Sequence, residues 1–373
     1  MKPLDPVVLE ALKEVGEKFR LQGEIDSYDL ITHGNINTTY CVKYNNPDKY
    51  YIFQKVNTYV FHDPVEIMKN IDLVTEHIRV KNSRAATVLP ALHYHHTEDG
   101  KNYWFGAKDK FWRVSNNFDA LTYQASSDPA VLKMAGKAFG EFQRNLSDFD
   151  ASLLFETIPN FHNTKKRLEG FFANVEKDEL GRVKEVEKEI EFVRSHRALA
   201  EKLTNLLEEG KIPTRVTHND TKINNVLFNK ENGEPLVVID LDTVMPGLPA
   251  HDFGDAVRFA ANTAAEDEKD LSKVSFDLEL YRGFAEGFIS ETAGILTDAE
   301  LETMALGAIT IAIELGMRFL DDYITGDKYF KTRYEGHNLD RTRCQFALAA
   351  DMEKKFDLMN KIVFDTAKSI KNR

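Results

Sequence analysis

The stretch from residue 216 to 244, VTHNDTKINNVLFNKENGEPLVVIDLDTV, places a histidine, three aspartates and several asparagines between apolar runs. His218, Asp220 and Asn225 fit the spacing H-x-D-x-x-x-x-N, and Asp240 follows the apolar run VVI. Moving a phosphoryl group requires a carboxylate that accepts the hydroxyl proton and oxygen ligands that hold Mg²⁺ against the nucleotide phosphates. These residue types therefore indicate phosphoryl-transfer chemistry.

A polar surface hairpin is the alternative interpretation of the same residues. Residues 214–217 predict a short strand, residues 226–228 a second, and PLVVID a third after a turn at Asn232-Gly233. The loop from 218 to 225 then lies between strands, and Asp240 stands where a buried strand ends, so the polar side chains can converge. In protein kinases the same pattern supplies the base from the loop aspartate, and the metal ligands from the asparagine and the strand-end aspartate. We therefore favour phosphotransferase chemistry over the hairpin.

The chain changes its periodicity along its length, which predicts two lobes. Residues 27–56 alternate and are rich in Tyr, Val, Ile and Thr, and NYWFGAKDKFWRVSNNF continues the strand pattern. Between them, Asp63-Pro64 opens a predicted helix. From Pro129 onward the spacing is mostly helical. We predict an α+β, two-lobed, protein kinase-like fold, with a small β-rich N-terminal lobe (1–114) and a larger, mostly helical C-terminal lobe (115–373).

Composition and charge narrow the class of protein. The 373 residues are 42% apolar and 29% charged, as in a folded globular protein of roughly two domains. The net charge of −12 argues against a nucleic-acid partner, because an acidic field repels a phosphate backbone. The two cysteines, Cys41 and Cys344, are too few and too far apart for a disulfide framework. With no long apolar run and no secretory leader, we expect no membrane partner and a cytoplasmic location.

Several segments resemble the aminoglycoside phosphotransferase and choline kinase-like superfamily. The stretch THNDTKINNVLF…VVIDLDTVMPGLPAHDFGDAVRF carries this resemblance. Within the superfamily the chain is most similar to the N-acetylhexosamine 1-kinases, through GNINTTY, FQKVN, FHDPVEIMKNI, TIPNFHNTKKR and LGMRFLDDYITGDKYFKTRYEGHNLDRTRCQ. The resemblance covers most of the chain. It implies transfer of the γ-phosphoryl group of ATP, with Mg²⁺, to the anomeric C1 hydroxyl of GlcNAc or GalNAc.

The resemblance also assigns roles within the central stretch. It makes Asp220 the base that takes the sugar hydroxyl proton, and Asn225 and Asp240 the Mg²⁺ ligands, with Asp242 as an additional candidate. Lys222 stands where a lysine of many related kinases contacts the γ-phosphate. Whether one or two metal ions bind is left open.

Another aspartate could be mistaken for the metal ligand, because the letters DFG occur at residues 252–254. Asp252 lies after a turn that contains proline and glycine and opens a helix, whereas Asp240 ends the buried strand. We predict that Asp252 braces the catalytic loop through hydrogen bonds, and capping of the helix by Asp252 or Asp255 is the simpler alternative. His218 is likewise expected to hold the loop rather than to exchange protons.

One lysine of the N-terminal lobe is the candidate contact to the nucleotide. Lys55 in YYIFQKVN lies late in a predicted strand, where kinases place the lysine that contacts the α- and β-phosphates. An ordinary surface lysine is the alternative. The acidic partner of Lys55 on the following helix is left open among Glu66, Asp72 and Glu76.

The rest of the nucleotide site is predicted from position in the fold. The loop THGNINTTY, which contains Asn35, should cover the phosphates, although it has one glycine in place of a glycine-rich motif. The adenine is expected to lie against FWRVSNNF and to use backbone groups of Arg113, Val114 and Ser115.

The resemblance to the hexosamine kinases suggests four sugar contacts besides the base: Asn35, Phe259, Arg318 and Tyr329. Arg318 lies on an otherwise apolar predicted helix, where its guanidinium needs a partner, and its fork of donors suits sugar hydroxyls or a carbonyl. An ion pair with Asp321 or Asp322 is the alternative. Phe259 could stack on the pyranose ring or simply belong to the core.

Other functions are compatible with parts of the pattern. A kinase fold without activity would lack the base or a metal ligand, yet Asp220, Asn225 and Asp240 are all present. A metal-dependent hydrolase would not need Lys55 or a nucleotide-binding lobe. The acceptor could also be an aminoglycoside, choline or homoserine, since a cationic substrate suits an acidic chain. The histidines of HYHH (93–96) predict a solvent-facing strand rather than a metal site, and the choice between monomer and homodimer is left open.

Overall fold

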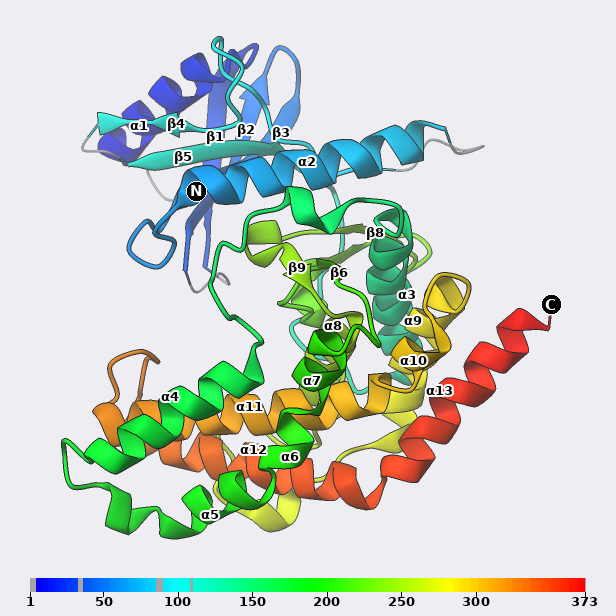
Figure 1. Ribbon diagram of the computed structural model, residues 1–373. Coiled ribbons are helices and arrows are strands. Elements are labelled where there is room, and N and C mark those ends of the chain that lie inside the picture. The colour runs from blue at the N-terminus through cyan, green and yellow to red at the C-terminus, as the bar shows by residue number, and fades with distance from the viewer. Residues whose placement is uncertain (1–4, 33–35, 85–89, 108–109, 373) are drawn as a thin grey trace.

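A computed structural model describes residues 5–32, 36–84, 90–107 and 110–372. The N-terminal lobe contains a five-stranded antiparallel sheet in the order β1-β2-β3-β5-β4, with two helices packed on it (Figure 1). The strands are β1 (Glu24–Ile31), β2 (Thr38–Asn45), β3 (Lys49–Val56), β4 (Trp104–Phe105) and β5 (Phe111–Asn116). The helices are α1 (Pro6–Lys18) and α2 (Pro64–Ser83).

The two faces of this sheet have different partners. Phe53 and Val114 pack with Leu12 of α1 in a small core of their own. Val56 and Phe111, which alternate to the opposite face, belong to the larger core that includes α2 and the C-terminal lobe. Strand alternation therefore decides whether a residue faces α1 or faces α2 and the C-terminal lobe, and we call this second face the catalytic side because the candidate site described below lies there.

The C-terminal lobe is mostly helical and carries two small antiparallel ribbons. Strand β6 (Arg215–Thr217) pairs with β9 (Met245–Gly247), and β7 (Val226–Phe228) pairs with β8 (Pro235–Val238). The helices are α3 (Pro129–Asn145), α4 (Thr164–Lys177), α5 (Glu187–Ser195), α6 (Arg197–Ala200), α7 (Lys202–Glu208), α8 (Pro249–Ala260), α9 (Leu278–Thr292), α10 (Asp298–Leu301), α11 (Met304–Thr325), α12 (His337–Lys354) and α13 (Phe356–Lys371). Helices α11 and α12 run side by side beneath the ribbons in Figure 1.

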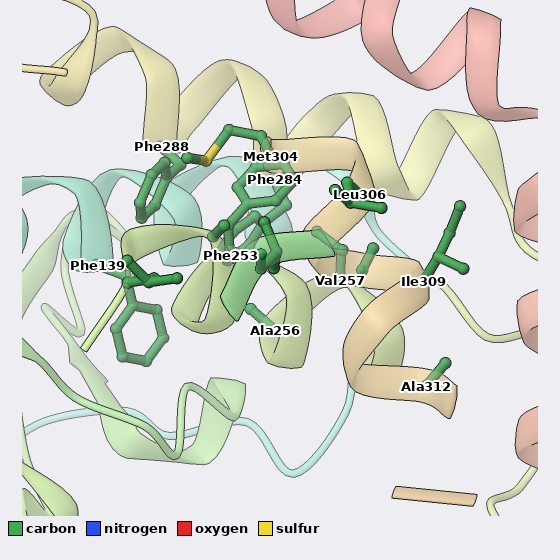
Figure 2. Packing of buried hydrophobic residues seen from close by; sticks show 14 of the residues in the cluster. Phe139, Phe253, Ala256, Val257, Phe284, Phe288, Met304, Leu306, Ile309 and Ala312 are labelled. Atoms are coloured by element: carbon green, nitrogen blue, oxygen red, sulfur yellow. The ribbon is translucent and has the colours of Figure 1, made fainter. Parts of the chain in front are cut away.

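A continuous hydrophobic core joins α3, α8, α9 and α11. Figure 2 shows Phe253 of α8 packed beside Phe284 and Phe288 of α9. Helix α8 also touches α11 backbone to backbone, since a Cβ at Gly254 would lie 2.5 Å from the carbonyl group of Gly307. A side chain at Gly254 would therefore push the two helices apart.

The predicted fold class is confirmed, with an antiparallel sheet in the N-terminal lobe followed by a helical C-terminal lobe. The predicted limit between residues 114 and 115 falls inside β5, so we propose Asn116, where that strand ends, as the limit instead. Within the described ranges, no helix is both long enough and apolar enough to cross a membrane.

Candidate active site

A buried carboxylate braces the loop between β6 and β7. Asp252, in the first turn of α8, accepts hydrogen bonds from the backbone N–H groups of His218 at 2.9 Å and Asn219 at 2.7 Å. The side-chain amide of Gln143 donates a third at 2.8 Å. Burial raises the pKa of Asp252, and the three donors offset part of that cost. These contacts match the bracing role predicted for Asp252.

The imidazole of His218 connects the loop to the end of β8. Its Nε2 lies 2.9 Å from the carbonyl oxygen of Ile239, so Nε2 carries the proton and donates. Its Nδ1 then accepts a hydrogen bond from the backbone N–H of Asp220 at 3.3 Å. Phe139 and Phe142 pack edge-on against the buried ring. With both nitrogens engaged, His218 holds the loop and is not placed to exchange protons with a substrate.

Asp220 is a partly exposed carboxylate with a lysine and an asparagine beside it. The Nζ of Lys222 lies 2.7 Å from its Oδ1. The side-chain amide of Asn225 donates to the backbone oxygen of Asp220 at 2.8 Å and to its Oδ2 at 3.2 Å. Burial acts to lower the pKa of Lys222, but the negative charges of Asp220 and Asp255 outweigh it and raise that pKa. The loop thus presents a proton acceptor next to a cation that could face a phosphate.

Asp240 has the surroundings of a metal ligand. Asp240 is an exposed residue, but the protein around its carboxyl displaces part of the water that would stabilise the charge. This desolvation is the largest cause that raises the pKa of Asp240 to about 7, and the negative charges of Asp242 and Asp220 add to it. A divalent cation would relieve this repulsion. No group of three or more His, Cys, Asp or Glu side chains in the described ranges forms a metal cluster. Mg²⁺ needs only one or two protein carboxylates beside water and phosphate oxygens, so the oxygen donors of Asn225 and Asp240 fit it.

Asp242 does not stand free beside Asp240. One of its oxygens forms a buried ion pair with Arg113 of β5, and the other accepts a hydrogen bond from the side-chain amide of Asn37 at 2.8 Å. Because the N-terminal lobe engages both oxygens, we propose that Asp242 positions its neighbour Asp240, and its direct contact with the metal stays a prediction. Arg113 and Asp242 are 129 positions apart, so no local sequence pattern could reveal the pair.

The backbone of β5 is not free to bind an adenine at residues 113–115. One edge of β5 pairs with β3. At the other edge, the backbone N–H of His95 donates to the oxygen of Val114 at 2.8 Å, and that of Asn116 donates to the oxygen of His93 at 3.1 Å. We therefore correct the backbone contacts predicted for Arg113, Val114 and Ser115. The segment that follows Asn116 and joins the two lobes is a better candidate.

Strand alternation turns Lys55 away from the C-terminal lobe. Lys55 lies opposite Trp112 in the β3–β5 register, and Trp112 packs in the cluster with α1. The neighbouring Gln54 lies opposite Arg113 and accepts a hydrogen bond from its Nε at 3.0 Å. The structure therefore does not support a phosphate contact by Lys55, because phosphates next to Asp240 would meet the other face of the sheet.

Two of the three acidic candidates for pairing with Lys55 have other partners. On α2, Asp72 lies 3.3 Å from His96, and Glu76 pairs with Arg79 at 2.6 Å. In the described parts of the chain, Lys55 forms no ion pair with any of the three predicted acidic candidates. Asn35 of the predicted phosphate loop lies outside the described residues.

The structure brings together Arg318 and Tyr329, two of the residues that the resemblance suggests as sugar contacts. The guanidinium of Arg318 lies 5.8 Å from the ring of Tyr329, 5.7 Å from that of Phe161 and 5.6 Å from that of Phe330. Such cation–π contacts hold a guanidinium without occupying its in-plane hydrogen-bond donors. Arg318 can therefore still donate to a ligand.

The two aspartates proposed as alternative partners of Arg318 are used elsewhere. Asp322 accepts the backbone N–H groups of residues 328–330 at 2.8–2.9 Å. Asp321 accepts the side-chain amide of Asn174 at 2.9 Å. Among the described residues, no carboxylate forms an ion pair with Arg318, which leaves the ligand-binding interpretation in place.

Phe259 lies in a different hollow from Arg318. It lines a pocket of about 650 Å³ together with Ile223, from the loop between β6 and β7, and Arg258 of α8. Arg318 lines a pocket of about 290 Å³ with Arg167. The structure therefore does not place Phe259 with Arg318 and Tyr329, and of these two pockets the larger one includes a residue of the loop between β6 and β7.

A buried glutamate near Arg318 was missed by the sequence reasoning. Glu314 of α11 accepts a hydrogen bond from Thr164 at 2.7 Å, contacts the Nδ1 of His162 at 2.9 Å, and lies 3.6 Å from the Nε of Arg167. Burial alone would raise the pKa of Glu314, but these partners outweigh it and lower the pKa to about 2. The only sequence signal is an acidic residue within a long apolar helix. Glu314 anchors the start of α4 to α11.

We predict that Glu314→Gln removes a pH-dependent part of the stability. The folded-state pKa of about 2 lies below the ordinary value of 4.5, so the contribution is complete above pH 4.5 and is lost as the pH falls toward 2. The free energy of unfolding should be lower in the variant by about 3 kcal/mol at neutral pH. Urea unfolding at pH 7, 5 and 4 measures this difference, which should shrink at pH 4. A difference that stays constant over this range would contradict the prediction.

The family described as "phosphotransferase enzyme family" matches residues 27–284, from β1 into α9. The chain belongs to this family. The match includes Asp220, Asn225 and Asp240, and it confirms the predicted superfamily. The chain is therefore a phosphotransferase of this family, whereas the finer similarity to the N-acetylhexosamine 1-kinases stays a prediction.

Solved structures show the same architecture across nearly the whole chain of this phosphotransferase. The microcompartment-associated aminopropanol kinase is 15% identical, with a TM-score of 0.60 over 95% of this chain and 98% of that chain. The choline kinase from Cryptosporidium parvum is 13% identical, with a TM-score of 0.54 over 94% and 96%. A spectinomycin phosphotransferase in complex with ADP and spectinomycin is 15% identical, with a TM-score of 0.51 over 98% and 99%. At these identities the similarity shows the fold alone, which is the predicted kinase-like one.

Proposed function

We propose that this phosphotransferase moves the γ-phosphoryl group of ATP, with Mg²⁺, to the C1 hydroxyl of an N-acetylhexosamine, GlcNAc or GalNAc. One observation carries the reaction type. On the loop braced by Asp252, the Asp220 carboxylate lies between Lys222 and Asn225, and its charge acts on nearby Asp240. These are the base, the phosphate-facing cation and the metal ligands that phosphoryl transfer requires. The ADP held by the spectinomycin phosphotransferase supports ATP as the donor.

In the proposed reaction each of these side chains has one task. Asp220 accepts the proton of the C1 hydroxyl, while the hydroxyl oxygen bonds to the γ-phosphorus and the bond from that phosphorus to the bridging oxygen of ADP breaks. Lys222 faces the oxygens of the transferred group and offsets their charge. Asn225 and Asp240 would hold Mg²⁺, which supplies positive charge beside the β- and γ-phosphates. The hydrogen bonds of Asp252 keep the loop in one geometry during the transfer.

The choice of acceptor rests on the resemblance and on Arg318. Its guanidinium has aromatic rings around it and in-plane donors that suit the N-acetyl carbonyl or the hydroxyls of a sugar. Tyr329 beside it is 71% exposed, so its ring can pack on a bound sugar. An amino alcohol is the second candidate, because the similar folds include an aminopropanol kinase and a choline kinase and the chain carries a net charge of −12.

A ³¹P NMR measurement distinguishes these acceptors. Purified protein, ATP and Mg²⁺ are incubated with GlcNAc, GalNAc, choline or aminopropanol in separate samples. We expect a new phosphate resonance coupled to an anomeric proton for one or both hexosamines. A phosphate ester of an amino alcohol, with none from the sugars, would discard the hexosamine assignment and keep the kinase.

The same assay tests the contribution of Arg318. Arg318→Met should raise the KM for the hexosamine by about tenfold or more, with the KM for ATP unchanged, because a lost charged hydrogen bond to substrate costs about 1.5–3 kcal/mol. Arg194→Met is a matched control, since Arg194 of α5 also lies over a ring, that of Phe172, at 5.6 Å. Equal KM values in both variants would remove Arg318 from the acceptor site.

A further inference from the structure

Arg113 of β5 is buried where the two lobes meet. Its guanidinium pairs with Asp242, its Nε donates to Gln54 at 3.0 Å, and the ring of Tyr94 lies 5.5 Å away. The side chains of Arg113 and Asp242 are 1% and 5% exposed. The Nη2 of Arg113 has no hydrogen-bond partner among the described residues, although it is buried. A charged group of the N-terminal lobe is thus held against one carboxylate of the C-terminal lobe.

The carboxylate of Asp242 also accepts a hydrogen bond from the N-terminal lobe. Asn37, between β1 and β2, donates to Asp242 at 2.8 Å and accepts the backbone N–H of Asn57, just after β3, at 3.0 Å. Taking an ion pair out of water costs free energy, so a buried pair is weak grounds for stability on its own. The Arg113–Asp242 pair is therefore better explained by a role in fixing one arrangement of the two lobes than by a contribution to stability.

Asp240 lies between two anchored residues. Its φ of 61° is left-handed, a conformation that a residue with a side chain keeps only when its surroundings hold it. On one side, the N–H of Ile239 donates to the oxygen of Asn225 at 2.9 Å, and the oxygen of Ile239 accepts from His218. On the other side, Asp242 is bound to the N-terminal sheet. One anchor therefore belongs to each lobe.

Protein kinases use a different ion pair in the N-terminal lobe to complete the active site. There, a lysine of the third strand pairs with a glutamate of the following helix, and this pair must form for activity. Here the third strand presents Gln54 to the catalytic side, and Lys55 faces α1. Arg113, directly opposite Gln54 on the adjacent strand, places a cation on the same face of the sheet as Gln54.

We propose that Arg113 is a positioning residue for the metal carboxylate: by holding Asp242 it sets the direction of Asp240, so that metal binding depends on docking of the N-terminal sheet. This inference rests on the proposed kinase function. It concerns the chain's own residues and does not depend on which acceptor is phosphorylated.

Asp242→Asn tests the proposal in the full chain without an acceptor. Both oxygens of Asp242 accept hydrogen bonds, one from Asn37 and one from Arg113. In Asp242→Asn one oxygen becomes an NH₂ group, which cannot accept, so one of the two hydrogen bonds is lost in either orientation of the amide. Isothermal titration with ADP at a series of Mg²⁺ concentrations should show Mg²⁺ affinity weakened by about 10- to 100-fold, the usual effect of losing a residue that orients a metal ligand. Binding of ADP without metal should not change.

Arg113→Met should weaken Mg²⁺ affinity to the same extent, and Arg113→Lys, which keeps the charge, should recover part of it. The double variant Arg113→Met/Asp242→Asn should be no weaker than either single variant, because all of them lose the same ion pair. It leaves no unpaired buried charge, so it decides the question if a single variant does not fold.

Glu300→Gln is the matched control, since Glu300 is a buried carboxylate that forms an ion pair with Arg215 at 2.6 Å. It should lower the melting temperature and leave Mg²⁺ affinity unchanged. If Asp242→Asn and the double variant behave like this control, the inference is overturned and the kinase function stands. If the wild-type protein binds no ADP with or without Mg²⁺, the proposed function fails, and this inference falls with it.

Discussion

Asp220→Asn is expected to lower kcat by about 10²- to 10⁴-fold while nucleotide and sugar still bind. An asparagine has nearly the same shape and can still accept the hydrogen bond from the side chain of Asn225, but it cannot accept the proton of the attacking hydroxyl. A coupled assay of ADP release gives kcat, and titration calorimetry gives the affinities for ATP and for the hexosamine.

Asp351→Asn is a suitable control for this variant. Asp351 of α12 is also a carboxylate paired with a lysine, Lys355 at 2.7 Å, and it lies outside the catalytic loop. We expect its kcat to remain near that of the wild type. Turnover close to normal in Asp220→Asn would remove Asp220 as the base, and loss of binding together with turnover would indicate a collapsed loop instead.

Asp240→Ala should abolish most of the Mg²⁺ dependence of nucleotide binding, whereas Asp252→Ala should not. The negative charges of Asp242 and Asp220 act on the carboxylate of Asp240, and a cation bound to Asp240 would offset this repulsion. Asp252 instead satisfies the donors of His218, Asn219 and Gln143, and leaving them unpaired costs about 1–3 kcal/mol for each buried group. We therefore expect a large loss of stability in Asp252→Ala, and a Mg²⁺ affinity reduced by tenfold or more only in Asp240→Ala.

Titration calorimetry with ADP at several Mg²⁺ concentrations, combined with thermal melting, separates the two variants. Each serves as the control for the other, because both lose one aspartate from the surroundings of the same loop. The reverse ranking, with Mg²⁺ affinity lost in Asp252→Ala and kept in Asp240→Ala, would show that the DFG letters at 252–254 mark the metal ligand after all.

The sequence is sufficient to predict the loop between β6 and β7 and the strands around it, because the signals there are local. Asp220, Asn225 and Asp240 lie within one short stretch, and the flanking strands and turns follow from apolar runs and the Asn-Gly turn. The bracing by Asp252 could also be predicted, since a polar residue on a buried helix face beside such a loop needs partners. The change from alternating to helical periodicity was enough to predict the two lobes.

The face of a strand residue is harder to predict, and Lys55 shows why. Shifting the assignment by one position moves a side chain to the other face of the sheet, and FQKVN contains two polar residues in a row. Choosing Gln54 as the residue on the catalytic side requires the pairing with Arg113 on β5. That pairing joins segments 59 positions apart, and their sequences contain no sign of it.

Contacts between distant helices were likewise out of reach of sequence reasoning. Glu314 and Thr164 are 150 positions apart, and each looks ordinary in its own helix. Arg318 could be selected because a cation on an apolar helix is unusual, but its aromatic partners come from two separate segments. The resemblance, rather than any periodicity, led to Tyr329.

The glycine contact between α8 and α11 limits how this enzyme can move. Gly254 and Gly307 bring the two helices together backbone to backbone, with no side chain between them to slide or tilt. Helix α8 carries the brace of the base, Asp252, and α11 carries Arg318 of the candidate acceptor wall. The two helices are therefore packed as closely as their backbones allow at this point, and this contact holds the brace of the candidate base beside the helix that carries Arg318. A change of acceptor is therefore expected to come from exchanging side chains on these helices, because moving α8 and α11 apart would open a gap where their backbones now touch.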